Sequence, residues 1–121
     1  MTTLTEGTHA GEFIISEGNG HIARKKITVL AAEVLVAGAV LGLVTASGKY
    51  VEHDPAAVDG SENAIAILFE AVDATAGDTD GVAIARMSEV NGDEITWKTG
   101  IIAGDITDGI ASLETVDIIV R

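Results

Sequence analysis

The stretch VLVAGAVLGLVTASG, residues 34–48, consists almost entirely of small and aliphatic side chains. Such a stretch could be a membrane segment, a signal sequence or the inside of a soluble β-protein. Charged residues bound it on both sides, Glu33 before it and Lys49 after it. The uncharged run is therefore shorter than the roughly 18–20 apolar residues that a spanning helix needs. Extending the span across Glu33 would cost about 2.5 kcal/mol or more. The stretch does not predict a membrane helix.

Three basic residues, Arg24, Lys25 and Lys26, precede this stretch, but they do not make it a secretion signal. A signal peptide carries its basic residues at the start, whereas 23 residues, three of them acidic, precede Arg24. The recurring valines favour a pleated, packed surface. Gly38 and Gly42 would weaken a helix but suit a turn and a close backbone approach. We therefore expect a bend at Gly38 and then a buried strand in which Gly42 permits close packing.

Further strands are expected on both sides of this stretch. Short β-prone runs occupy residues 12–16, 27–29, 39–46 and 49–53, and longer ones occupy 64–72 and 82–90. Ser47-Gly48 has the length of a hairpin connection between two of these runs. The run 64–72 is apolar on both faces, which predicts a central strand with Ile65, Ile67 and Phe69 buried.

One short helix is expected near the end of the chain. Ile106, Ile110 and Leu113 recur at the spacing of a helix face, with Asp105 placed to cap it, which predicts a helix over about 105–114. The run DIIVR, residues 117–121, should follow as a strand.

The composition predicts one domain that hides apolar surface against partners. The 121 residues are 47% hydrophobic with a mean hydropathy of +0.37, yet only 3% are aromatic. A core without large rings favours burial between subunits, so we expect an oligomer. The net charge of −12 lies entirely in residues 27–121, because residues 1–26 carry three acids and three bases. Such an acidic body disfavours nucleic-acid binding.

No residue pattern predicts a metal, a cofactor or a catalytic group. Without cysteine there is no thiolate ligand or thiol nucleophile. The acidic run 73–81 fails as a calcium loop, because its first and last ligand positions fall on Ala76 and Met87. His9, His21 and His53 lack metal-ligand spacing and are expected in loops or at the surface.

Several segments taken in order resemble one family. They are EFIISEGNGHIARKKITV (12–29), AGAVLG (37–42), SGKYV (47–51), DPAAVDGS (54–61), IL (67–68) and the terminal DIIVR. Over about residues 12–121 the chain is similar to the lambda-type bacteriophage head decoration proteins. Glu33-Val34-Leu35 departs from the family pattern, which puts the local turn in doubt.

The resemblance implies a mainly β fold and a mechanical, non-enzymatic role. The fold would be a small β-clip or β-tulip-like domain with one or two short helices and an extended N-terminal arm. The implied assembly is a homotrimer at threefold and quasi-threefold positions on the outside of an expanded phage head, made in the host cytoplasm. There it would clamp the major capsid protein against the pressure of packaged DNA, with no membrane or nucleic acid as partner.

The capsid contact is expected in the arm, residues 1–26, and trimer formation in the β-rich domain, residues 27–121. The candidate capsid-binding residues are Glu12, Phe13, Ile14, Ile15 and Ser16. Their backbone would pair with a capsid strand edge while Phe13 or Ile15 fills a pocket. Deleting residues 1–17 should therefore sharply reduce head binding and leave the remaining body folded. The alternative is that Phe13, Ile14 and Ile15 fold back onto their own domain.

Two other classes of function stay open from the sequence. A trimeric β-clip enzyme, such as a nucleotide hydrolase, could share the architecture. An adhesion or glycan-binding module would need exposed aromatic side chains, for which Tyr50 and Trp97 are the candidates.

Overall fold

The computed structural model describes residues 9–18 and 22–121 of the chain. In these residues it contains ten β-strands and one α-helix. The elements are β1 (Ile14–Glu17), β2 (Arg24–Val29), β3 (Val34–Leu35), β4 (Val40–Val44), β5 (Lys49–Glu52), β6 (Ala66–Leu68), β7 (Val72–Asp73), β8 (Thr79–Ile84), β9 (Ser88–Val90), α1 (Ala103–Glu114) and β10 (Ile118–Val120). The prediction of a small, mainly β domain is confirmed.

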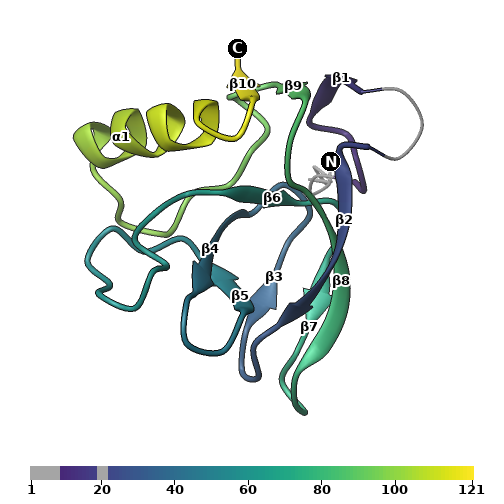
Figure 1. Ribbon diagram of the computed structural model, residues 1–121, viewed down its shortest axis with the longest axis vertical. Coiled ribbons are helices and arrows are strands. Elements are labelled where there is room, and N and C mark those ends of the chain that lie inside the picture. The colour runs from purple at the N-terminus through teal and green to yellow at the C-terminus, as the bar shows by residue number, and fades with distance from the viewer. Residues whose placement is uncertain (1–8, 19–21) are drawn as a thin grey trace, which may run out of the picture.

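Five strands close into a barrel in the order β2-β5-β4-β6-β8 (Figure 1). β2 and β8 form a long antiparallel ladder that runs from Arg24 opposite Ile84 to Val29 opposite Thr79. On its other side β2 meets β5 in parallel, through Val29 and Tyr50. The barrel wall is therefore tightly paired on one side of β2 and open along most of the other.

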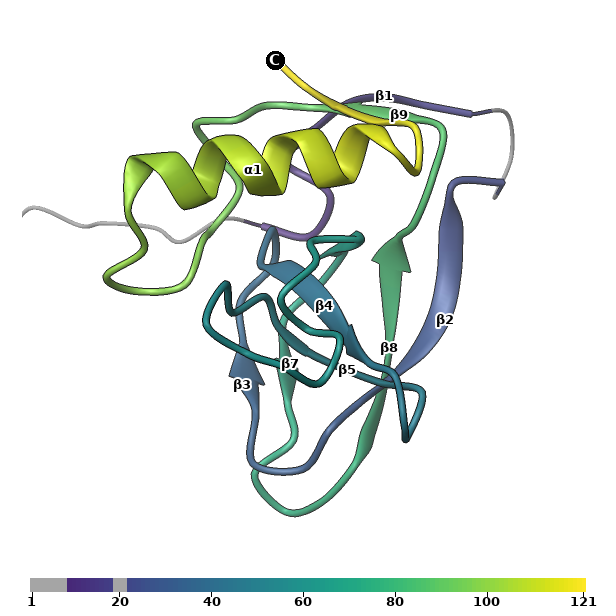
Figure 2. The same ribbon diagram turned by 60° about the vertical axis from the view of Figure 1, so that its left-hand side comes forward.

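A second sheet and the helix cover one end of the barrel (Figure 2). In this sheet, which we call the cap sheet, β9 lies between β1 and β10. β9 pairs antiparallel with β1 and parallel with β10. The cap sheet thus joins the early, middle and late parts of the chain.

Residues 34–48 form the predicted bend and buried strand. The backbone turns at Gly38, whose φ is 87°, and Val40 and Leu41 of β4 are fully buried. A Cβ at Gly42 would lie 2.4 Å from the Ser61 carbonyl oxygen, so a side chain does not fit there. The hairpin from β4 to β5 is confirmed, although its turn spans residues 45–48 rather than two residues. Within the described residues, no helix has the length and apolarity to cross a membrane.

Two hydrophobic clusters form the core, one inside the barrel and one beneath the cap sheet and α1. β6 contributes side chains to both clusters: Ala66 and Leu68 lie in the first, and Ile67 lies in the second. A two-sided central strand is therefore present, but it is shorter than the predicted 64–72: β6 covers only Ala66–Leu68, and Val72 begins β7, which pairs with β3. The predicted full burial of Ile65 and Phe69 is wrong: both lie just outside β6 and are half-buried.

The sequence predicts one strand over residues 82–90, and this is wrong. β8 ends at Ile84, the chain turns at Met87 with a φ of 50°, and β9 begins at Ser88. β8 pairs within the barrel, whereas β9 pairs in the cap sheet. The break is needed because the two halves of this apolar run belong to different sheets.

The predicted helix is confirmed as α1, but its start differs from the prediction. The N-cap is Ile102, which has no polar side chain to cap with, and Asp105 lies inside the first turn. There a carboxylate still favours the positive end of the helix dipole. The closing strand predicted at residues 117–121 is confirmed as β10.

Candidate functional site

The N-terminal segment from Gly11 onward lies against the body of the protein. The Gly11 N–H donates to the Phe69 carbonyl oxygen at 3.0 Å. Phe13 is 0% exposed and packs in the cluster beneath the cap sheet. β1 then pairs with β9, with Ile14 opposite Val90. Phe13 therefore folds back onto its own domain, which is the alternative to filling a pocket of the capsid.

A β-bulge in β1 turns Ile15 outward. Ile14 lies opposite Val90 and Ser16 lies opposite Glu89, so the ladder skips Ile15. Bulges are common at sheet edges and re-aim a side chain. Ile15 is 53% exposed.

Three of the five candidate residues reach the surface. Glu12 and Ser16 are exposed like Ile15, whereas Ile14 is half-buried and Phe13 is in the core. β1 is also an edge strand, so in the described residues its outer side carries no strand partner. Together these features make the outer edge of β1 a surface that can accept another strand.

Arg24 fixes the C-terminal end of β1. Its guanidinium donates to both carboxylate oxygens of Glu17, at 2.8 and 3.2 Å, and lies 4.3 Å from the ring centre of Phe69. The hydrogen bond to Glu17 raises the pKa of Arg24. Because Arg24 begins β2, the expected boundary between arm and body at residues 26 and 27 falls inside a barrel strand.

The histidines are not brought together. His9 is exposed and His21 lies outside the described residues. His53 lies in a loop, in line with the expectation of a loop or surface position, but it is only 2% exposed. His53 packs edge-on against Trp97, and its Nε2 lies 3.0 Å from the Glu62 carbonyl oxygen. Burial lowers the pKa of His53. In the described residues, no group of three or more His, Asp or Glu side chains is arranged to hold a metal ion.

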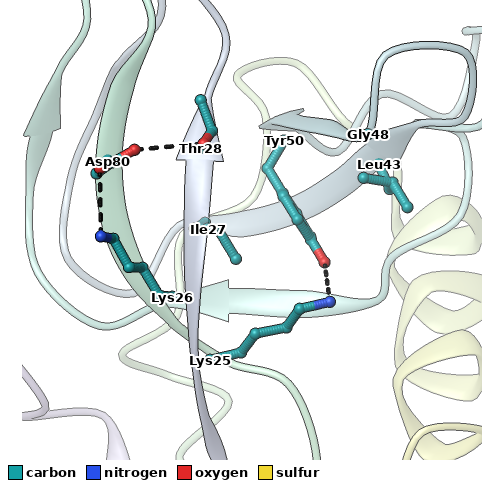
Figure 3. A pocket seen from close by; sticks show the side chains of 8 residues that line it. All are labelled: Lys25, Lys26, Ile27, Thr28, Leu43, Gly48, Tyr50 and Asp80. Carbon is teal, nitrogen blue, oxygen red and sulfur yellow. Dashed lines mark hydrogen bonds and ion pairs between the residues drawn. The ribbon is translucent and has the colours of Figure 1, made fainter.

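A hollow opens in the barrel wall where β2 and β5 diverge. Figure 3 shows its lining, which surrounds a volume of about 550 Å³: Lys25, Lys26, Ile27, Thr28, Leu43, Gly48, Tyr50 and Asp80. A second hollow shares Lys25, Leu43 and Tyr50 and extends to Ile65, Ala85, Arg86, Val116 and Asp117. We call the two together the side groove. It has an apolar floor, and its charged lining consists of Lys25, Lys26, Arg86, Asp80 and Asp117.

The seven basic residues of the chain differ in whether an acidic side chain neutralises them. Five form ion pairs: Arg24–Glu17, Lys26–Asp80, Lys49–Asp78, Lys98–Asp54 and Arg121–Glu89. Lys25 instead lies 3.5 Å from the Tyr50 hydroxyl, and Arg86 donates to the Ile22 carbonyl oxygen at 2.9 Å. Neither has a carboxylate within 4.0 Å among the described residues. Both line the side groove.

The loop between β5 and β6, residues 53–65, carries a fully displayed apolar side chain. Val58 is 96% exposed at this loop, which projects at the left of Figure 1. Side chains of the loop accept bonds from its own backbone: Asp54 from Ala56 at 3.0 Å, Asp59 from Ser61 at 3.0 Å and Glu62 from Gly60 at 2.7 Å. The loop is therefore held in one shape with Val58 at its surface.

The sequence alone predicts a functional role for neither the side groove nor Val58. Lys25 and Arg86 come from segments far apart in the chain, and only the fold brings them to one groove. Val58 lies within the DPAAVDGS motif, but the exposure of a valine depends on the packing around it. The turn residues of that motif, Asp54-Pro55 and Asp59-Gly60-Ser61, predict a turn but do not predict that Val58 is exposed.

Comparison with known proteins gives one match. A family model described as bacteriophage lambda head decoration protein D matches residues 3–118. No curated protein matches the sequence. The matched range includes β1, the side groove and the β5–β6 loop.

Proposed function

The chain belongs to the family of bacteriophage lambda head decoration protein D, and we propose that it binds the outside of the expanded phage head as a homotrimer at threefold and quasi-threefold positions. Membership of the family makes the protein a structural component of the virion that associates with the capsid. Its trimers would hold neighbouring copies of the major capsid protein together against the pressure of packaged DNA. The family match over residues 3–118 is the observation that carries this proposal.

The charge of the protein supports a place outside the head. The net charge of −12 repels the phosphate backbone of packaged DNA, so DNA is an unsuitable partner. The partners are instead the major capsid protein and further copies of this chain. Before assembly the protein would reside in the host cytoplasm.

The proposed capsid contact is the outer edge of β1. Its support is the backbone edge of β1, which has no strand partner on its outer side in residues 9–18 and 22–121, together with the exposed side chains of Glu12, Ile15 and Ser16. A capsid strand adding to this edge would gain main-chain hydrogen bonds, with Ile15 filling a pocket. Phe13 and the half-buried Ile14 would hold β1 in place from within. Three such edges per trimer would multiply a weak contact through effective concentration.

Mixing the purified protein with expanded, undecorated heads and imaging the product tests this function. Wild-type protein should appear as trimeric density on the outer surface. Ile15→Asp should reduce head binding roughly tenfold or more, because it places a charge in the apolar contact. Val34→Asp is the matched control, since Val34 is 65% exposed and lies in β3, outside the cap sheet. Heads that stay undecorated by wild-type protein would contradict the proposal, and normal binding by Ile15→Asp would contradict the contact.

Deleting residues 1–17 is a poorer test than the sequence suggests. The deletion removes Phe13 from the core and β1 from the cap sheet. Losing a buried phenylalanine costs about 3–5 kcal/mol, so the body itself would be weakened. A substitution at the exposed Ile15 avoids this.

The structure does not favour an adhesion or glycan-binding function. Tyr50 is only 6% exposed. Trp97 is half-buried and packs against Gly109 and His53. Neither ring presents the open face on which a sugar would stack. The family is structural rather than catalytic, and a nucleotide-hydrolysis assay tests the enzymatic alternative.

A further inference from the structure

We propose that the side groove of one subunit receives the β5–β6 loop of the next subunit, so that this contact, repeated three times, closes the trimer. The inference rests on the proposed homotrimer and specifies which surfaces form it. It commits to a second copy of this chain as the occupant of the groove.

The charge of the groove calls for an acidic partner. The chain has 19 acidic and 7 basic residues, so a cation that finds no carboxylate in its own subunit is unusual. Lys25 and Arg86 are both exposed, both lack such a partner among the described residues, and both line the side groove. The lining of the groove carries three basic side chains, Lys25, Lys26 and Arg86, against two acidic ones, Asp80 and Asp117. The groove thus has a small positive excess on an otherwise acidic protein. Another copy of the same acidic protein has complementary charge.

The apolar floor of the groove favours an occupant with an apolar side chain that would lie between Lys25 and Arg86. Leu43 and Ile65 are partly buried and line the same hollow as Tyr50. The Tyr50 hydroxyl is directed at Lys25 (Figure 3). Apolar surface of this kind gains stability when a neighbour covers it. The occupant should carry an aliphatic side chain flanked by carboxylates.

The β5–β6 loop has that pattern. Val58 is 96% exposed and is followed directly by Asp59, with Glu62 three residues further on. The internal hydrogen bonds of Asp54, Asp59 and Glu62 already fix the loop, so little conformational entropy is lost on docking. Val58 would cover Leu43 and Ile65, while the free carboxylate oxygens of the loop approach Lys25 and Arg86.

The two surfaces also satisfy the symmetry of a ring. A cyclic trimer is built from heterologous contacts, in which one surface of each subunit meets a different surface of its neighbour. Residues 54–62 of the loop and the groove are two such unlike surfaces on one chain, whereas Ile65, at the end of the loop, belongs to the groove. Each would be used once per subunit, so that neither stays uncovered in the closed ring.

Sedimentation of two complementary variants tests the contact. Arg86→Glu alters the groove and leaves the loop intact, whereas Val58→Asp alters the loop and leaves the groove intact. Each variant alone should lose trimer association roughly tenfold or more, because it places like charge or a buried charge in every contact. Mixed together, they can form one intact contact but no closed ring, so a heterodimer should appear. Arg121→Glu makes the same charge change outside the groove and should remain trimeric.

The outcomes separate this inference from the function on which it rests. Trimers of wild-type strength in both variants would overturn the inference, and monomers alone in the mixture would overturn it too. Circular dichroism of each variant checks that the fold is retained, which both exposed positions favour. Binding of wild-type protein to expanded heads is measured in parallel. A trimeric protein that does not bind heads would contradict the proposed function and leave the loop–groove contact standing.

Discussion

The two phenylalanines of the chain differ in how deeply they are buried, and their alanine variants should differ accordingly. Phe13 is 0% exposed, so Phe13→Ala should lower the free energy of unfolding by about 3–5 kcal/mol. Phe69 is half-buried with Arg24 over its ring, so Phe69→Ala should cost clearly less. Urea denaturation of both variants measures the difference. Equal losses, or a loss at Phe13 within about 0.5 kcal/mol of zero, would contradict the placement of β1.

A single buried imidazole should make stability depend on pH. Burial lowers the pKa of His53 below its ordinary 6.5, so the folded chain binds this proton less readily than the unfolded chain. The stability that depends on a neutral His53 is fully present above about pH 6.5. It is lost as the pH falls toward the lower pKa that His53 has in the folded chain. The carboxylates of Asp54 and Asp105 raise the pKa of His53, but the lowering by burial is larger.

Urea denaturation between about pH 8 and pH 5 measures this effect. The wild-type free energy of unfolding should fall more steeply than that of His53→Gln over this range. Parallel curves for the two proteins would show that His53 is not the group responsible.

At the scale of elements, β4 depends on the absence of a side chain at Gly42. The nearest atoms to an added Cβ are the carbonyl oxygen and Cα of Ser61, at 2.4 and 2.6 Å. Backbone atoms cannot rotate away, so Gly42→Ala should destabilise the protein by about 1–3 kcal/mol in denaturant unfolding. Gly104→Ala is the control, because a Cβ there has no described atom within 4 Å and alanine favours a helix by up to about 1 kcal/mol. A neutral Gly42→Ala would contradict the packing of β4 on Ser61.

Local patterns were enough to predict some elements but not others. β4, β5, β6, α1 and β10 follow from apolar periodicity and turn residues in their own segments. The turn at Met87 does not, because residues 82–90 are uniformly strand-like and the break follows from β9 pairing with β1 and β10. The inward turn of Phe13 likewise depends on a pocket built by distant residues such as Ile84 and Leu113.

The same limit applies to the candidate site. The run EFIIS marks a strand, and the sequence could therefore identify β1 as a surface for pairing. It could not show which side chains face outward, because a bulge at Ile15 shifts the alternation of the strand. It also could not assign ion-pair partners, whereas the side groove is recognised by Lys25 and Arg86, which have no carboxylate partner among the described residues.

For the whole molecule, the proposed role predicts a mechanical effect on the virion. DNA-filled heads decorated with the protein should release their DNA at a higher temperature than undecorated heads, because the trimers add contacts between capsid subunits. Heating both kinds of head and following dye access to the DNA measures the difference. Empty expanded heads serve as the control for dye binding to protein. Release at the same temperature would contradict a stabilising role.

The order of strands in the cap sheet determines when, during synthesis, the outer edge of β1 can form. β1 pairs with β9, and β9 is covered on its other side by β10, residues 118–120. A pair of strands without the third is marginally stable in water. During synthesis β1 emerges from the ribosome first. β10, which completes the cap sheet, is synthesised more than a hundred residues later. The outer edge of β1 therefore forms in its final shape only after residue 120 has been translated, and an unfinished chain offers a capsid no such edge.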